Sequence, residues 1–126
     1  MKKVIGLILA AVMALSLCTT AFAQKESVKI AIVQQLDHPS LDEIRTAAQA
    51  KLADIAKETG VEIEVKEFNG QNDTSILNQI GAQVAQDGYD AVIPIATLAA
   101  ICMTTATEET DIPVVYAAIS DPASAG

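Results

Sequence analysis

The sequence predicts an α/β fold, a doubly wound parallel sheet, behind an N-terminal signal peptide. Short β-branched runs alternate with segments whose apolar residues recur every three or four positions, in the order β-α-β-α-β-α-β. Glycine, proline or polar turn residues separate the segments. Consecutive strands joined by helices lie parallel in one sheet, and their crossovers are right-handed.

The first 23 residues have the features of a secretory signal peptide. Two lysines precede an apolar run from Val4 to Leu17, and Ala21-Phe22-Ala23 provides a small-x-small cleavage site. The apolar run is too short to span a bilayer, which takes about 20 residues. Cleavage after Ala23 is favoured over lipid attachment at Cys18, because bulky Leu17 precedes that cysteine. The protein is therefore expected to be exported, to the periplasm or outside the cell.

Charge and cysteine content narrow the function further. Acidic residues number 16 against 8 basic ones, for a net charge of −8 at pH 7, and loss of the two signal lysines makes the remainder more acidic. Such a surface disfavours nucleic acid and anionic lipid as partners. Only Cys102 remains after cleavage, so no internal disulfide is expected. Its neighbours Ile101 and Met103 favour a buried core residue over a nucleophile.

The first strand and helix follow the signal. Val28 to Val33 is a short β-branched run typical of a strand. A capping box of Ser40 and Glu43 is expected to start the helix, and Gly60 is placed to end it. The helix is predicted from one apolar face at three- and four-residue steps: Leu41, Ile44, Ala48, Leu52 and Ile55.

The second strand and helix come next. Val61 to Phe68 alternates apolar and charged residues, which predicts a strand with one wet face near a sheet edge. A helix is expected to begin at Asn72 or Asp73 and to end at Gly88.

The third and fourth strands are predicted nearer the C-terminus. Ala91 to Ala96 is apolar throughout, as in a central parallel strand, although Pro94 cannot donate to a ladder. Thr97 is expected to cap a helix running towards Glu109, and Pro113 to Ile119 to form the fourth strand. No helix follows to cover that strand, so residues 24–126 are expected to be part of a longer folding unit.

Candidate binding residues cluster where the strands end. Ligands of open parallel sheets bind beyond the carboxyl ends of the strands, and a helix N-terminus there suits a carboxylate. Each candidate has a structural alternative: Thr97 as a cap, His38 as a helix starter, and Asp37 or Asp121 as a turn residue. Gln34 and Gln35 alternate in direction, so only one of them can face the cleft. The candidates are Gln35, Asp37, His38, Thr97, Ser120 and Asp121.

Motifs for enzymatic chemistry are missing from the sequence. No glycine-rich loop follows the first strand and no Gly-x-Ser-x-Gly elbow occurs. A single histidine without a cysteine or second histidine nearby is weak support for a metal site. The sequence therefore predicts a protein without cofactor, metal or enzymatic activity.

Four stretches of the sequence, in order, carry a family resemblance: His38 to Asp42, Asn69 to Asp73 with Leu77 to Ile80, Ile95 to Thr97 with Ala99 and Ala100, and Ile112 to Val115 with Ser120 to Pro122. Together they resemble the tryptophan/tyrosine-type substrate-binding proteins of ABC transporters. The resemblance implies two α/β lobes that close on a small ligand, with residues 24–126 as the first lobe and the second lobe absent. It also implies binding residues at Gln35 to His38, at Thr97 with Leu98 (where the family often has proline), and at Ser120 and Asp121.

Three functions follow as hypotheses. The first is a receptor that captures an amino-acid-like, possibly aromatic, ligand and passes it to an ABC permease for import. The second is a ligand-sensing module of the same fold coupled to a signalling partner. The third is a secreted α/β enzyme, which would need a nucleophile and base that these residues lack.

Overall fold

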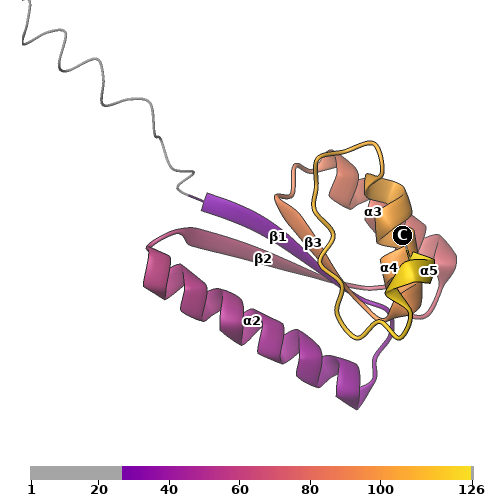
Figure 1. The fold of residues 1–126 in the computed structure, drawn as a ribbon, viewed down its shortest axis with the longest axis horizontal. Coiled ribbons are helices and arrows are strands. Elements are labelled where there is room, and N and C mark those ends of the chain that lie inside the picture. The colour runs from indigo at the N-terminus through magenta and orange to yellow at the C-terminus, as the bar shows by residue number, and fades with distance from the viewer. Residues whose placement is uncertain (1–26, 126) are drawn as a thin grey trace, which may run out of the picture.

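The computed structural model describes residues 27–125, which form a three-stranded parallel sheet with helices on both faces (Figure 1). The predicted signal peptide and Cys18 lie outside the described residues. Between residues 27 and 125, no helix combines the length and apolar character needed to cross a membrane. The elements are β1 (Ser27–Gln34), α2 (Pro39–Thr59), β2 (Glu62–Asn69), α3 (Thr74–Gln86), β3 (Ala91–Ile95), α4 (Thr97–Thr107) and α5 (Pro122–Ala125).

The sheet order is β2-β1-β3, which makes β1 the central strand and β2 an edge strand. Ile30 of β1 aligns with Val65 on one side and with Ala91 on the other. The edge position of β2 explains its alternating charged residues and confirms the sequence prediction. Because the chain goes from β1 to one neighbour and then crosses to the other, the order reverses beside β1, between β1 and β3.

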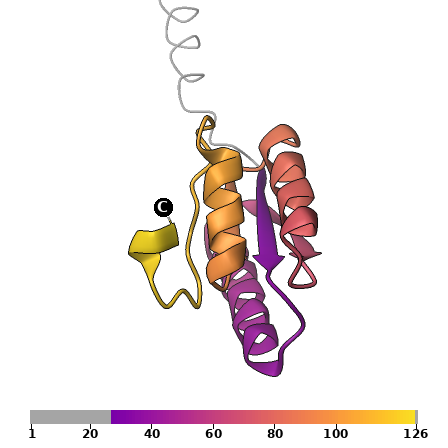
Figure 2. The same ribbon diagram turned by 90° about the vertical axis from the view of Figure 1, so that its right-hand side faces the viewer.

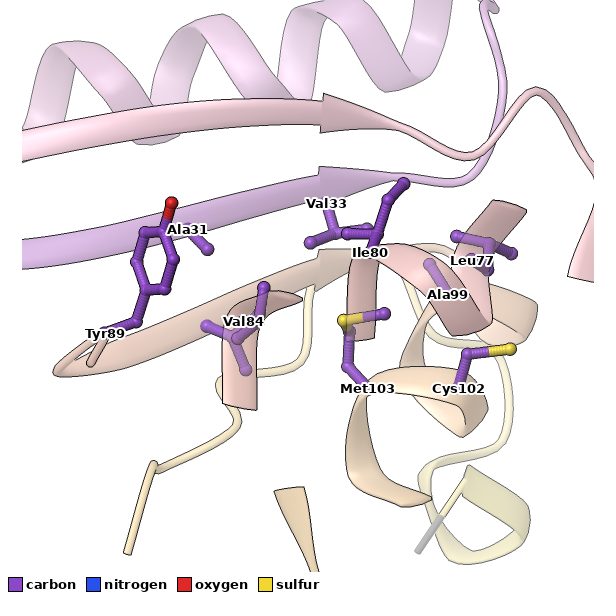
Figure 3. Packing of buried hydrophobic residues seen from close by; sticks show 10 residues of the cluster. Ala31, Val33, Leu77, Ile80, Val84, Tyr89, Ala99, Cys102 and Met103 are labelled. Carbon is purple, nitrogen blue, oxygen red and sulfur yellow. The ribbon is translucent and has the colours of Figure 1, made fainter. Parts of the chain in front are cut away.

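The two faces of the sheet are covered unequally. α2 lies along one face and α3 and α4 pack together on the other (Figure 1). No residue of α2 is fully buried. The main hydrophobic cluster lies on the opposite face, where Ala31 and Val33 of β1 meet Leu77 and Val84 of α3 and Met103 of α4 (Figure 3). Cys102 belongs to this cluster, which confirms its predicted place in the core.

The helix starts differ from the predictions in two of three cases. α2 is capped by His38, whose Nδ1 accepts the Ser40 N–H at 3.2 Å, so the Ser40 capping box is wrong. Pro39, with its fixed φ, occupies the first helical position and shifts Ser40 inside the helix. The cap of α4 is Ala96, with no side-chain cap bond, so Thr97 is not the cap.

The remaining helix boundaries agree with the sequence. Asp73 caps α3, accepting the Ser75 N–H at 2.7 Å and the Ile76 N–H at 3.2 Å. Gly60 ends α2 with φ 71°, and Gly88 with φ 70° follows the end of α3, in the left-handed region that favours glycine. α4 ends at Thr107, two residues before the predicted Glu109.

The predicted fourth strand is the main error in the fold. Residues 113–119 run parallel to β3 but make only two isolated bridges, Val92 with Val114 and Ile95 with Ala117. Val92 N–H and Ala96 N–H donate to this segment at 3.0 Å each, and Pro94 lies between them. Proline has no N–H to donate, so the ladder is interrupted at its middle position.

The chain after this segment stays close to α4. Tyr116 and Thr104 share a hydrogen bond of 3.0 Å between their hydroxyls, which ties the segment to the helix. In Figure 2 the chain from 113 to 121 passes beside α4 and ends in α5, which packs against α4. The loop that carries Ser120 and Asp121 is thereby brought back to the start of α4.

Candidate ligand-binding site

The candidate residues gather at the carboxyl end of the sheet, beside the reversal of strand order. The chain leaving β1 turns to α2 on one face, whereas the chain leaving β3 enters α4 on the other. Diverging loops of this kind create a crevice, the usual binding position in open α/β sheets. We call the end loops of β1, β2 and β3, with the Ser120–Asp121 loop, the rim; they comprise residues 35–38, 70–73, 96–98 and 118–121.

Gln35 links three of these loops. Its backbone N–H donates to the Ile95 carbonyl at 3.2 Å and its carbonyl accepts the Asn72 N–H at 2.8 Å. Its side-chain Oε1 accepts the Leu98 N–H at 3.0 Å, and its Nε2 donates to Asn72 Oδ1 at 2.9 Å. The side chain of the preceding Gln34 points the other way, towards Asp42 and Arg45 of α2, as the alternation of neighbouring strand residues predicts.

The start of α4 brings backbone donors and hydroxyls together. The first N–H groups of a helix have no intrahelical partner, and at α4 the Leu98 N–H is satisfied by Gln35. The Thr97 and Ser120 hydroxyls lie 3.5 Å apart, so the predicted pairing of these two loops at one point is observed. Thr97, which is partly exposed, supplies a further N–H group at this helix end, whereas Ala99 is fully buried.

Backbone strain is concentrated at the same rim. Four non-glycine residues of the described chain have positive φ, and all four lie in rim loops: Gln71 at 51°, Asn72 at 56°, Ala96 at 80° and Ala118 at 54°. Ala96, with ψ 161°, occupies a region that is almost confined to glycine. Strain of this kind persists only where surrounding contacts hold the backbone, and it is typical of ligand sites.

The acidic and imidazole candidates have different surroundings. Asp37 accepts from Asn69 Nδ2 at 2.5 Å, and His38 is engaged in capping α2. Asp121 makes no side-chain hydrogen bond to the described residues, and only its carbonyl is engaged, by the Ser124 hydroxyl at 3.0 Å. Among the described residues, no hydrogen bond joins Asp37 or His38 to Thr97 or Ser120, so the candidates fall into two groups along the rim.

A polar network lies behind the rim, between α2 and the sheet. Buried Gln34 donates to the Leu36 carbonyl at 2.7 Å and to Asp42 at 2.9 Å, and accepts from Arg45 at 3.0 Å. Arg45 also donates to both oxygens of Glu67 at 3.1 Å, and this pairing raises the pKa of its guanidinium. The arrangement holds the loop after β1 in place.

A hollow of about 330 Å³ adjoins this network. It shares only Asp37 with the candidate residues. Arg45 and Glu67 are already paired with each other and Asp37 accepts from Asn69, so the hollow has little free polarity to offer a ligand. The start of α4 is the better candidate because its donors and hydroxyls converge there. The residues that line the hollow are Gln34, Asp37, Arg45, Glu67, Phe68 and Asn69.

Sequence reasoning missed three residues that lie in the rim or directly beside it. Asn69 and Asn72 hold Asp37 and Gln35, and Ala96 carries the strained turn into α4. The two asparagines could have been suspected, because asparagine after a strand tolerates the left-handed region and bonds neighbouring loops. Nothing in the local sequence marks Ala96, since alanine has no preference for its conformation.

The rim can therefore hold a small zwitterion. Backbone N–H groups and the positive end of the α4 dipole attract a carboxylate, and the Thr97 and Ser120 hydroxyls can donate to the same group. The Asp121 carboxylate can pair with an ammonium. None of the aromatic residues Phe68, Tyr89 and Tyr116 is among the rim residues; Phe68 and Tyr89 pack with the core cluster, and Tyr116 bonds α4.

The chain is similar to known proteins in sequence as well as in fold. The model of the family described as ABC transporter substrate binding protein matches residues 29–126. A tyrosine-binding protein of Clostridioides difficile (strain R20291) is 30% identical over 139 aligned residues, covering 99% of this chain and 40% of that protein.

Two solved structures share the fold at higher identity. A Streptococcus pneumoniae ABC domain in complex with L-Trp is 38% identical with a TM-score of 0.66, over 76% of this chain and 31% of the other. A ligand-free, open substrate binding protein with adhesive properties from Clostridium difficile is 33% identical with a TM-score of 0.66, over 79% of this chain and 33% of the other.

This chain thus spans less than half the length of each of these relatives. The α/β fold with its parallel sheet, predicted from the sequence, is confirmed by these structures. The family match covers nearly all of the described residues, and so the chain belongs to the family of ABC transporter substrate binding proteins.

Proposed function

We propose that this chain is the first lobe of an exported receptor that captures an amino acid, with tyrosine and tryptophan as the first candidates, and delivers it to an ABC permease. The proposal assigns residues 24–126 to one wall of the binding cleft. A second lobe supplies the other wall, and closure of the two lobes buries the ligand.

The observation that carries the proposal is the convergence at the start of α4. Two hydroxyls 3.5 Å apart, from Thr97 and Ser120, stand at a helix N-terminus beside the reversal of strand order. The ligand carboxylate binds the Thr97 N–H and these hydroxyls. Its ammonium pairs with Asp121, or with Asp37 where the ligand reaches across the rim.

The relatives support the choice of ligand. One is a tyrosine-binding protein and another was crystallised with L-Trp. This lobe offers no aromatic side chain on its rim, so the ring of the ligand contacts mainly the second lobe. Residues 24–126 alone are therefore expected to bind such amino acids weakly or not at all.

Isothermal titration of the complete gene product tests the proposal. L-tyrosine and L-tryptophan are compared with tyramine, which lacks the carboxylate, and with 3-(4-hydroxyphenyl)propionate, which lacks the ammonium. We expect loss of either charged group to weaken binding by about tenfold or more, since a charge-assisted hydrogen bond contributes roughly 1.5–3 kcal/mol.

Variants locate the ligand on this lobe. Thr97→Val is expected to reduce affinity about tenfold, whereas Thr46→Val, an isosteric change on the exposed side of α2, leaves it unchanged. Binding of a sugar with no response to any amino acid would overturn the proposed ligand class. Turnover of the bound compound by the complete protein would favour an enzyme instead.

A further inference from the structure

We propose that Gln35 is the positioning residue of the rim: it holds the end loops of β2 and β3 together and fixes which N–H groups of α4 remain open to a ligand. The inference rests on the proposed function for its ligand and on the hydrogen bonds of Gln35 for its geometry. It differs from the expectation that Gln35 contacts the ligand itself.

The position of Gln35 in the sheet explains why one residue can do this. β1 is the central strand, so the residue that follows it lies between the loops leaving β2 and β3. Gln35 makes two backbone and two side-chain hydrogen bonds, to Ile95 and Leu98 on one side and twice to Asn72 on the other. The carboxamide is suited to this task because it carries a donor and an acceptor on one planar group.

The same bonds hold a strained backbone. Asn72 at φ 56° and Ala96 at φ 80° flank Gln35 in space, and each is held in an unfavourable conformation. Gly70 is also packed under Gln35, since a Cβ at that position would lie 3.1 Å from the Gln35 carbonyl oxygen. Loss of the Gln35 side chain is therefore expected to loosen both loops at once.

The consequence for the ligand concerns the free donors of α4. Gln35 Oε1 occupies the Leu98 N–H, which leaves the Thr97 N–H free at this helix end, and the Thr97 hydroxyl lies 3.5 Å from that of Ser120. The carboxylate is thereby directed to that side of the helix end. A negative charge in place of the carboxamide would satisfy the Leu98 N–H but repel the incoming carboxylate.

Two variants separate these effects. Gln35→Leu removes both side-chain bonds, whereas Gln35→Glu retains the acceptor for Leu98, loses the donor to Asn72 Oδ1 and adds the charge. Gln79→Glu, an exposed position on α3, adds the same charge away from the rim and serves as the control. Amide hydrogen exchange at Leu98 reports the positioning, and titration of the complete gene product with L-tyrosine reports binding.

The two variants are expected to rank in opposite order in the two measurements. Gln35→Leu has the larger effect on Leu98 exchange, and Gln35→Glu has the larger effect on affinity for L-tyrosine. Leu98 exchange is about five- to tenfold faster in Gln35→Leu and unchanged in Gln35→Glu, because the helix end keeps its acceptor. Affinity for L-tyrosine falls about tenfold in Gln35→Leu and further in Gln35→Glu. In Gln35→Glu, affinity for tyramine falls less than affinity for L-tyrosine does, because tyramine carries no carboxylate for the new charge to repel.

Each failure has a distinct meaning. Unchanged Leu98 exchange in Gln35→Leu overturns the positioning role. Normal L-tyrosine affinity in Gln35→Glu, with Leu98 still protected, overturns the assignment of the carboxylate to this helix end. Absence of amino-acid binding by the unmodified protein overturns the proposed function, while the exchange result still decides the role of Gln35.

Discussion

Replacing Tyr89 with phenylalanine is expected to stabilise the protein, which is unusual for a core substitution. The Tyr89 residue is 4% exposed, and its hydroxyl has no hydrogen-bond partner among the described residues. Figure 3 shows the ring lying over Ala31 at the edge of the cluster. An unsatisfied buried hydroxyl costs about 1–3 kcal/mol, so its removal should raise the free energy of unfolding by about 1 kcal/mol.

The phenylalanine keeps the contacts of the ring. The centroids of the Phe68 and Tyr89 rings lie 6.2 Å apart in an edge-to-face arrangement, and the Lys29 ammonium lies 4.4 Å from the centroid of the Tyr89 ring. Both contacts depend on the aromatic face and edge and not on the hydroxyl. In a domain of this size, 1 kcal/mol corresponds to a melting temperature higher by about 4–8 °C.

Tyr116→Phe is the matched control, because it makes the same chemical change but is expected to shift the free energy of unfolding in the opposite direction. The Tyr116 hydroxyl lies 3.0 Å from the Thr104 hydroxyl, so its removal should lower the free energy of unfolding by about 1 kcal/mol. Urea unfolding of both variants followed by circular dichroism measures the two effects. A Tyr89→Phe protein destabilised as much as Tyr116→Phe would refute the reasoning, since the hydroxyl would then have a partner.

The dependence of stability on alkaline pH gives a second test of the buried Tyr89 hydroxyl. Burial raises the pKa of the Tyr89 hydroxyl above its ordinary value, and Asp87 and Glu64 raise it further. As the pH rises, the unfolded chain loses this proton before the folded chain does. The free energy of unfolding is therefore unaffected below about pH 10, and it declines as the pH rises from there through the folded pKa. The advantage of Tyr89→Phe over the unmodified protein should therefore widen above about pH 10.

Three further substitutions or modifications have defined outcomes. Ala96→Gly should raise the free energy of unfolding by about 1 kcal/mol, because glycine adopts φ 80° without strain; Ala99→Gly within α4 should lower it by a similar amount. Urea titration distinguishes the two. Gly70→Ala should lower stability by about 2 kcal/mol, because the added Cβ would lie 2.3 Å from buried Leu77, and a neutral effect would show that the turn yields. Iodoacetamide should modify Cys102 at least about tenfold more slowly in the folded protein than in denaturant, since burial raises the pKa of its thiol; equal rates, read by mass spectrometry, would contradict its burial.

Local sequence patterns predicted most of the fold because they act over short distances. The β-branched run of β1 and the alternation in β2 located two strands and the edge position of one. Asp73 and Gly60 were identified because their side-chain acceptor and left-handed backbone act on the adjacent turn. The prediction of a fourth strand was wrong because the partner strand contains Pro94, and pairing depends on both strands.

For the candidate site too, the sequence predicted the general location but not the roles of individual side chains. The rim and the meeting of Thr97 with Ser120 follow from the rule that parallel strands end on one edge, which the order of elements already implies. The roles of individual side chains do not follow: His38 caps its own helix, and Gln35 bonds Leu98 and Asn72 from distant parts of the chain. Such partners are selected only when the strands align.

The sequence by itself therefore determined the strands β1 to β3, the helices α2 to α4, the sheet edge where the candidate residues gather, and the family, because periodicity, turn chemistry and ordered motifs are properties of the linear chain. The tertiary structure decided the cap of α4, the interruption of the fourth strand by Pro94 and the bridging role of Gln35. Each of these depends on hydrogen bonds between residues that are far apart in sequence. Their donors and acceptors meet only after the sheet has set the register of its strands.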